Sequence, residues 1–396
     1  MGTFKDATKS HPCPICGKTD WCSHFIPDNP AYSGQELPVC RRIHVQEIQS
    51  PIDGHPYYFV KEFPDASVLY TDTPKSSTGF RKQKGYVFKP SDKVISAPKK
   101  PEIPVRSNKE LNLIYRDLLS MLQLSKRHNS MLRKDGWSAE LIKKSRISSL
   151  HLKKSFDESK KMYSDQHERK RIAKLLLEKH SSLIGVPGFY QDEDGQWTFV
   201  GKQGILIPIY DRNHNIYRLR LRLDRPDLDE KGKEKNKYKN FSSYVEEKNE
   251  GGELRNIYMN GCRAGSQVGI YYDPACDSSA ICYITEGEKK AIVANHVLKC
   301  IVISLPGVNT FSKLTEKDTS GISTVDFLRS IGCKKTIVAY DADKSTNNVV
   351  QRCEEKLITL LKESSFETYT TSWNPGFGKG LDDILLLGVY PTIHLI

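Results

Sequence analysis

The sequence predicts a multi-domain α/β protein: an amino-terminal zinc ribbon, a helical and basic α+β subdomain, and a carboxyl-terminal domain with a parallel sheet. Three observations predict this order. Four of the ten cysteines lie within the first 40 residues, a helical period begins near Lys109, and short apolar strands alternate with helical patterns after Ile281. We expect the ribbon and hairpins in 1–95, a linker in 96–108, the basic subdomain in 109–275 and the sheet domain in 276–396.

Composition and charge exclude several classes of protein. The 396 residues include 60 Lys or Arg and 48 Asp or Glu, which gives a formal net charge of +12. Apolar runs stay far below the roughly 18 residues of a membrane-spanning helix. MGTFKDATKSHP contains no apolar signal core, and the cysteines are too sparse for a secreted disulfide framework. We therefore expect a cytoplasmic protein of a reducing compartment.

The early cysteines predict a structural metal site. Cys13 and Cys16 form a CxxC knuckle, whose tight turn aims both sulfurs at one ion, and Cys22 and Cys40 complete a set of four. Thiolates favour zinc over magnesium or calcium, and four protein ligands leave no open position for a catalytic water. The alternatives are four unrelated thiols, or a histidine in place of one cysteine. Three histidines lie close enough in sequence: His11, His24 and His44.

The middle of the chain is predicted to form hairpins, a linker and then helices. Prolines and charges in SAPKKPEIPVRSN indicate the linker, and apolar residues at three- and four-residue steps from Lys109 indicate an amphipathic helix. Alternation in GILIPIYDRNHNIYRLRLRLD indicates two strands around a turn at Asp211–Asn215. The other expected elements are strands at 57–60 and 85–88, a helix start at Ser138 and a helix at 167–180.

Positive charge is concentrated in the expected helices. Residues 126–179 hold sixteen Lys or Arg against seven Asp or Glu, a surplus of nine. Such a surplus matches the electrostatic footprint of phosphate binding, and a solvated helix face is the simpler alternative.

Acidic residues follow the strands of the carboxyl-terminal third. Strands at ICYITEG, CIVISLPG and KTIVAYDAD alternate with helices at 288–299, 323–331 and 348–363. Because ligands gather at the carboxyl ends of parallel strands, these acidic groups can converge there on Mg²⁺ or Mn²⁺. Ordinary capping and turn chemistry is the alternative for each residue taken alone. The residues are Glu286, Asp341, Asp343 and Asp382.

Four segments resemble one family in the same order. TEGEKKA (285–291), SLPGVNTF (304–311), YDAD (340–343) and KGLDDIL (379–385) look like the Toprim domain of DnaG-type primases and related phage and plasmid proteins. Upstream, GILIPIYDRNHNIYRLRLRL followed by KYKNFSS resembles the basic subdomain that precedes Toprim in primases. With the amino-terminal ribbon, the resemblance covers roughly residues 11–45 and 110–390.

The resemblance implies a role for each matched residue. Glu286 would be a general base and metal ligand, Asp341 and Asp343 the main metal ligands, and Asp382 a further acidic ligand. One position departs from the family: Lys290 stands where replicative primases carry an acidic residue, which puts a second metal site in doubt. Template or nucleotide phosphates would be contacted by Arg220, Arg222, Lys237 and Lys289.

The implied activity is that of a Mg²⁺- or Mn²⁺-dependent DNA primase. As a nucleotidyltransferase it would make short primers from nucleoside triphosphates on single-stranded DNA, for replication of a phage, plasmid or mobile element. No GxxxxGK[ST] loop occurs, so a separate helicase is the expected partner. The alternatives are a non-catalytic DNA-binding replication or initiation protein and a Toprim nuclease.

Overall fold

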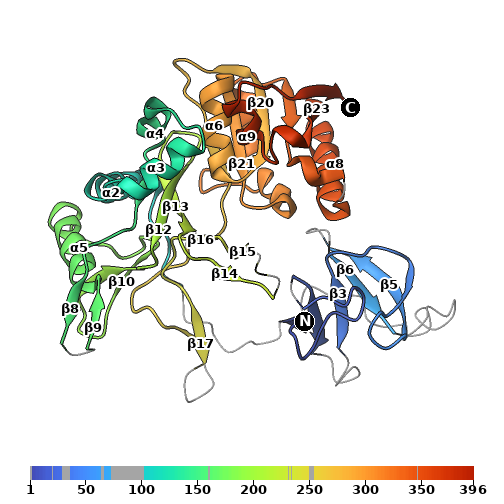
Figure 1. The fold of residues 1–396 in the computed structure, drawn as a ribbon, viewed down its shortest axis with the longest axis horizontal. Helices are drawn as coiled ribbons and strands as arrows, with labels where there is room; N and C mark the ends of the chain where they lie inside the picture. Colours follow the sequence, from blue (N-terminus) through green and yellow to red (C-terminus); the bar gives the residue numbers. More distant parts are fainter. Residues whose placement is uncertain are drawn as a thin grey trace. The chain divides into compact units, whose positions relative to one another are not determined.

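The structure of the chain is a computed structural model, and it divides into two compact units. The first contains Met1–Pro98 with Lys344–Lys356, and the second contains Lys99–Asp343 with Leu357–Ile396 (Figure 1). The strand expected at 85–88 and the first half of the expected linker lie outside the described residues. None of the described helices is long and apolar enough to cross a bilayer. The structure describes residues 2–19, 21–28, 36–63, 67–72, 102–158, 161–230, 232, 234–248, 254–345 and 347–396.

The first unit is built on a six-stranded antiparallel sheet with strand order β1-β2-β3-β6-β5-β4. The expected strand at 57–60 lies within β5. Its small core contains three of the four early cysteines together with Ile15 and Tyr70, so little apolar area is available to stabilise it. The strands are β1 (Gly2–Asp6), β2 (Ser23–Pro27), β3 (Leu37–Cys40), β4 (Glu47–Gln49), β5 (Pro56–Glu62) and β6 (Val68–Thr71).

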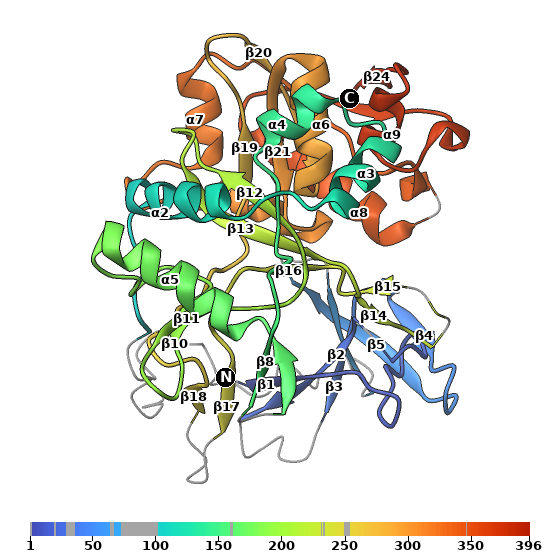
Figure 2. The ribbon, with the colours of Figure 1, turned by 60° about the vertical axis from the view of Figure 1, so that its left-hand side comes forward.

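The helical part of the second unit begins where the sequence predicts it. Ser107 caps α2 through a capping box with Glu110, and one face of α2 is buried on β13 and α5 (Figure 2). The predicted helix start at Ser138 is confirmed, because its hydroxyl accepts a hydrogen bond from the Leu141 amide. These helices are α2 (Asn108–Met121), α3 (Lys126–Lys134), α4 (Ala139–Ser145) and α5 (Gln166–His180).

A four-stranded antiparallel sheet with order β16-β13-β12-β7 follows. The predicted hairpin is confirmed: β12 and β13 pair around a turn in which the Asp211 carboxylate accepts amide hydrogen bonds from Asn213 and Asn215 at 2.8 and 2.9 Å. The strands are β7 (Ser148–Ser149), β12 (Gly204–Tyr210), β13 (Ile216–Leu223) and β16 (Tyr238–Asn240). Two-stranded ribbons surround it: β8 (Ser155–Asp157) with β9 (Met162–Ser164), β10 (Phe189–Gln191) with β11 (Trp197–Phe199), β14 (Asp227–Leu228) with β15 (Glu234–Lys235), and β17 (Glu246–Lys248) with β18 (Leu254–Asn256).

The last part of the second unit is a mixed six-stranded sheet with order β19-β21-β20-β22-β23-β24. Its four central strands are parallel, as predicted, and both edge strands are antiparallel. Helix α6 packs on β20 and β21 with α9 beside it (Figure 1). The strands are β19 (Gly269–Tyr271), β20 (Ser278–Glu286), β21 (Cys300–Leu305), β22 (Lys335–Val338), β23 (Glu367–Ser372) and β24 (Thr392–Leu395). The helices are α6 (Glu288–Leu298), α7 (Thr324–Ser330) and α9 (Leu381–Leu386), with short 3-10 turns η2 (Val308–Leu314) and η4 (Pro375–Phe377). Two further elements, η3 (Ala342–Ser345) and α8 (Asn348–Glu363), are divided between the units, because Lys344–Lys356 belongs to the first.

Candidate functional site

The sheet register brings Glu286 and Asp341 to the same edge. Ile284 of β20 pairs with Val338 of β22, so the parallel register sets the end of β20 level with the residues that immediately follow β22. Gly287 then turns the chain from β20 into α6 with φ of +88°. An added Cβ would meet nothing within 4 Å there, so the backbone conformation, and not space, requires glycine.

A lysine side chain lies among these carboxylates. Lys290, in the first turn of α6, forms an ion pair with Asp341, whose second oxygen lies 3.6 Å from the Lys379 ammonium. Burial alone would lower the pKa of Lys290, but the charges of Asp341 and Glu286 outweigh it and hold the pKa above its ordinary value. The edge of the sheet therefore attracts a cation, and Lys290 already supplies one.

Asp382 joins the same group from α9. Burial raises the pKa of its carboxyl, and the charge of Lys290 opposes this rise. A Cβ at Gly380 would lie 2.4 Å from an Asp382 oxygen and 3.0 Å from Cε of Lys290, so the absence of a side chain at 380 allows this approach. We call the set formed by Glu286, Lys290, Asp341 and Asp382 the acidic centre.

The acidic centre has the donor chemistry for one divalent cation. Carboxylate oxygens suit Mg²⁺ and Mn²⁺, and the Lys290 ammonium marks where positive charge is stabilised. However, lysines engage both oxygens of Asp341, and no three carboxylate oxygens of the described residues in this centre lie within 4.8 Å of one another. Asp343 lies in η3, and its side chain is outside the described part. The described side chains therefore do not form a converged set of carboxylate oxygens around a metal position.

Arg220, which the resemblance assigns to phosphate contact, is a buried side chain. It is 8% exposed, and its Nε lies 3.3 Å from an oxygen of Glu288, which is 2% exposed. Its two Nη atoms donate to the Asn240 side chain at 2.5 Å and the Pro306 carbonyl at 3.1 Å. At this position the arginine side chain is buried between β13, β16 and the start of α6. Arg220 connects β13 to the start of α6.

The other three predicted basic residues are more accessible. The Arg222 guanidinium is 3.9 Å from the Met131 sulfur, Lys237 pairs with Glu234 at 2.6 Å, and Lys289 pairs with Asp135 at 3.2 Å. Tyr238 of β16 pairs with Arg222 across the sheet. Partial burial raises the pKa of Tyr238, the charges of Glu288 and Asp382 add to this rise, and Arg222 opposes it. The edge strand β16 therefore lies near the acidic centre.

The four early cysteines come together as predicted. Their sulfurs all lie within 4.8 Å of one another, with 3.6 Å between Cys16 and Cys22 and 3.9 Å between Cys22 and Cys40. A tetrahedron with Zn–S bonds of about 2.3 Å requires sulfur separations of about 3.8 Å, so the set fits zinc. The amides of Arg42 and Ile43 donate to the Cys40 sulfur at 3.4 and 3.3 Å, as expected around a thiolate.

Sequence reasoning missed a buried histidine cluster in the second unit. His128 Nε2 lies 2.8 Å from one oxygen of Asp224, and His151 contacts the other. The Ser149 hydroxyl accepts the Ser125 amide hydrogen bond at 2.8 Å and lies 2.7 Å from His128 Nδ1. If that hydroxyl donates to Nδ1, the Nε2–H of a neutral His128 donates to Asp224, so every group is satisfied. No local sequence pattern could have revealed it, because its members are up to 96 residues apart.

Comparison with known proteins adds family and fold similarities. A family model described as a domain of unknown function (DUF3854) matches residues 271–388. No curated protein matches the chain. Solved structures similar to it are primases: the zinc-binding and RNA polymerase domains from Aquifex aeolicus (13% identity, 73% of this chain and 60% of that chain, TM-score 0.45), the DnaG RNA polymerase domain from Mycobacterium tuberculosis with DNA (11%, 71% and 77%, 0.43) and a primase domain from Pseudomonas aeruginosa (13%, 69% and 74%, 0.40). The chain thus spans 60% of the length of the Aquifex protein's structure.

Proposed function

We propose that this chain is a primase-like nucleotidyltransferase that makes short primers on single-stranded DNA, in the replication of a phage, plasmid or mobile element. The observation that carries the proposal is the acidic centre, where Glu286 and Asp341 lie at the carboxyl ends of neighbouring parallel strands and Asp382 of α9 lies near Lys290. Such an edge is where α/β sheets bind nucleotides. The absence of a P-loop in the sequence adds a separate helicase as partner.

The residues of the acidic centre divide the work in this proposal. Glu286 accepts the proton of the attacking 3′ hydroxyl, and Glu286, Asp341 and Asp343 are the ligands for Mg²⁺ or Mn²⁺. A bound divalent ion would lower the pKa of that hydroxyl and neutralise triphosphate charge. The Lys290 ammonium, held charged by Asp341 and Glu286, offers further positive charge to the triphosphate.

The basic residues and the zinc-binding unit position the strand and nucleotide. Arg222, Lys237 and Lys289 contact phosphates of template or triphosphate. Arg220 acts indirectly, because it is buried and holds β13 against Glu288. On the first unit, Trp21 is 44% exposed and lies 5.3 Å from the Arg42 guanidinium, an arrangement on which a base of single-stranded DNA can stack.

A second candidate is a DNA-binding replication protein without catalysis. The observation that favours it is the ion pair between Lys290 and Asp341, which neutralises a carboxylate that metal-dependent synthesis would use. A Toprim nuclease would use the same carboxylates with water as the nucleophile. The three candidates differ in outcome: a primase makes new strands, a nuclease shortens DNA, and the non-catalytic protein only binds DNA.

Incorporation of labelled nucleotides on single-stranded DNA tests the proposal. With Mn²⁺ or Mg²⁺ and nucleoside triphosphates, we expect the wild type to make primers and Asp341→Asn to lose at least about 100-fold in rate, the scale of a lost electrostatic contribution. Asp194→Asn, at a carboxylate that is 74% exposed and remote in sequence, is the control and should retain activity. Equal synthesis by wild type and Asp341→Asn refutes the assignment. Shortened DNA without synthesis indicates the nuclease, and salt-sensitive binding alone indicates the non-enzyme.

A further inference from the structure

A cavity lies in the same unit as the acidic centre, near the start of β20. It has a volume of about 420 Å³, within the size range of sites for single small ligands. The residues that precede β20 line this cavity, and Glu286 of the acidic centre lies at the other end of that strand. The last turns of α6 also line the cavity, and Lys290 of the acidic centre lies in the first turn of α6. Eleven residues of helix span about 16 Å, so the two sites are separate.

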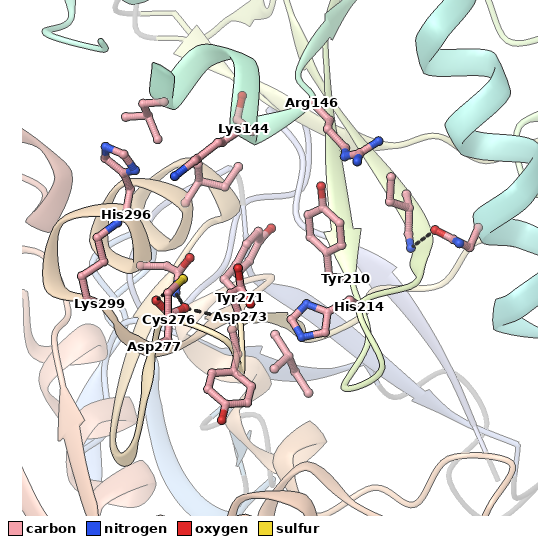
Figure 3. Close-up of a pocket in the computed structure, with 18 of the residues that line it drawn as sticks. Lys144, Arg146, Tyr210, His214, Tyr271, Asp273, Cys276, Asp277, His296 and Lys299 are labelled. Atoms are coloured by element: carbon pink, nitrogen blue, oxygen red, sulfur yellow. Dashed lines mark hydrogen bonds between the residues drawn. The ribbon is translucent and has the colours of Figure 1, made fainter. Parts of the chain in front are cut away.

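Aromatic side chains form one wall of this cavity. Figure 3 shows Tyr210 beside Tyr271, with His214 close to Tyr210. The Tyr210 and Tyr271 rings are 5.7 Å apart, and His214 stacks on Tyr272 with a ring separation of 6.1 Å and an interplanar angle of 27°. The Tyr271 hydroxyl donates to the Pro208 carbonyl, whereas the Tyr210 hydroxyl has no hydrogen-bond partner among the described residues. This wall offers flat ring faces and a free hydroxyl.

Two arginines face the Tyr210 hydroxyl without acidic partners. Burial raises the pKa of Tyr210 to about 12, and the nearby charges of Arg146 and Arg116 oppose this rise. Both arginines line the cavity and are exposed, and neither forms an ion pair with a described residue. Arg146 caps the end of α4, where a cation also offsets the helix dipole, but Arg116 lies in the interior of α2, where no such role exists.

The acidic residues of the cavity are engaged by their own turn. The Asp277 carboxylate accepts hydrogen bonds from the Asn295 side chain at 2.6 Å and the Asp273 amide at 2.8 Å. The Asp273 carboxylate accepts the Ala275 amide at 3.0 Å. Both carboxylates keep their charge, because these hydrogen-bond donors are neutral amides, but among the described residues neither forms an ion pair with Arg116 or Arg146. On the remaining side, Lys299 adds positive charge at the end of α6, beside His296, whose pKa is lowered by burial and by the charge of Lys299 (Figure 3).

We propose that this cavity binds a nucleoside monophosphate, separately from the acidic centre. The phosphate lies between Arg116 and Arg146, whose guanidinium groups form charged hydrogen bonds with phosphate oxygens. A phosphate oxygen also accepts a hydrogen bond from the Tyr210 hydroxyl. The base packs against the wall formed by Tyr210, Tyr271 and His214. The volume of about 420 Å³ suits a single nucleotide.

Titration calorimetry on the full zinc-loaded chain tests this site, with AMP, adenosine and inorganic phosphate as probes and no added divalent ion. We expect AMP to bind more tightly than either fragment, and Arg116→Ala/Arg146→Ala to weaken AMP at least about tenfold through loss of charged hydrogen bonds. Lys174→Ala, which removes an exposed and unpaired cation from α5, is the matched control. Asp341→Asn should leave AMP binding unchanged.

Cys276 gives an independent readout, because it lines the cavity and is the one exposed cysteine of the ten. We expect AMP to slow its alkylation by iodoacetamide in the wild type and in Asp341→Asn, but not in Arg116→Ala/Arg146→Ala. The proposal is overturned if AMP neither binds nor protects, if phosphate binds as tightly as AMP, or if the double variant binds AMP like the wild type. Loss of binding in Asp341→Asn would assign the nucleotide to the acidic centre, and protection by an oligonucleotide alone would indicate a strand-binding surface.

Discussion

Replacing Lys290 by methionine keeps an unbranched side chain but removes the charge that pairs with Asp341. The side chains of Lys290 and Asp341 are 19% and 15% exposed, so their ion pair lies between exposed and buried pairs. Exposed pairs contribute about 0–1 kcal/mol, and breaking a buried pair costs roughly 3–5 kcal/mol. We therefore expect Lys290→Met to lower the free energy of unfolding by about 2 kcal/mol in the absence of divalent ions.

Adding Mn²⁺ should reverse this loss, because the freed Asp341 oxygen and Glu286 then bind the ion in place of the ammonium. An ion at 100 times its dissociation constant stabilises the folded state by about 2.7 kcal/mol. Urea unfolding followed by circular dichroism measures the stability, and calorimetry measures Mn²⁺ affinity, for which we expect at least a tenfold increase, about 1.4 kcal/mol.

Lys170→Met is the matched control for this experiment. Lys170 pairs with Asp192 at 2.6 Å, and these side chains are 25% and 15% exposed, so a similar destabilisation is expected there without rescue by Mn²⁺. If Mn²⁺ affinity does not increase in Lys290→Met, or if both variants are rescued equally, then Lys290 does not occupy a cation site and the reasoning is wrong.

Three further outcomes follow from buried polar groups. Burial lowers the pKa of His128 below 6.5, so the unfolded chain binds more protons than the folded chain as pH falls below 6.5. The free energy of unfolding should therefore decrease on acidification, by up to about 1.4 kcal/mol per pH unit. Urea unfolding at several pH values measures this slope, and we expect it to be weaker in His128→Gln. Arg220→Met should cost roughly 3–5 kcal/mol by leaving Glu288 unpaired, and Arg220→Met/Glu288→Leu should recover most of it in the same assay; a single variant as stable as the double would contradict this. Cys40→Ser should lose zinc and the Co²⁺–thiolate absorption of the substituted protein, and retention of both would exclude Cys40 as a ligand.

Local patterns predicted most of the secondary structure. The helix from residue 108, the helix start at Ser138 and the strand pair around Asp211–Asn215 each depend on apolar spacing, a capping residue or a turn within a few positions. The cysteine set was also predictable, because a zinc ion bound by the CxxC knuckle needs two further thiolate or imidazole ligands to complete its tetrahedron. Only the backbone register was needed to bring Glu286 and Asp341 to one edge.

Pairings between distant residues could not be predicted in the same way. Alternating Leu and Arg indicated the strand β13, but the acidic partner of Arg220 is Glu288, far along the chain. Likewise, Lys290 could be recognised as a departure from an acidic position, but its ion pair with Asp341 depends on the α6 and β22 arrangement. In both cases the sequence identifies the charge, and tertiary packing decides its partner.

Helix α6 links the acidic centre to the arginine-lined cavity. Its first turn carries Lys290, and its C-cap is Lys299, so a single stiff rod joins the carboxylates to the arginine-lined cavity. A small tilt or slide imposed at one end must displace the other. If occupancy at one end alters affinity at the other, thermodynamic linkage requires the reverse effect to have the same size.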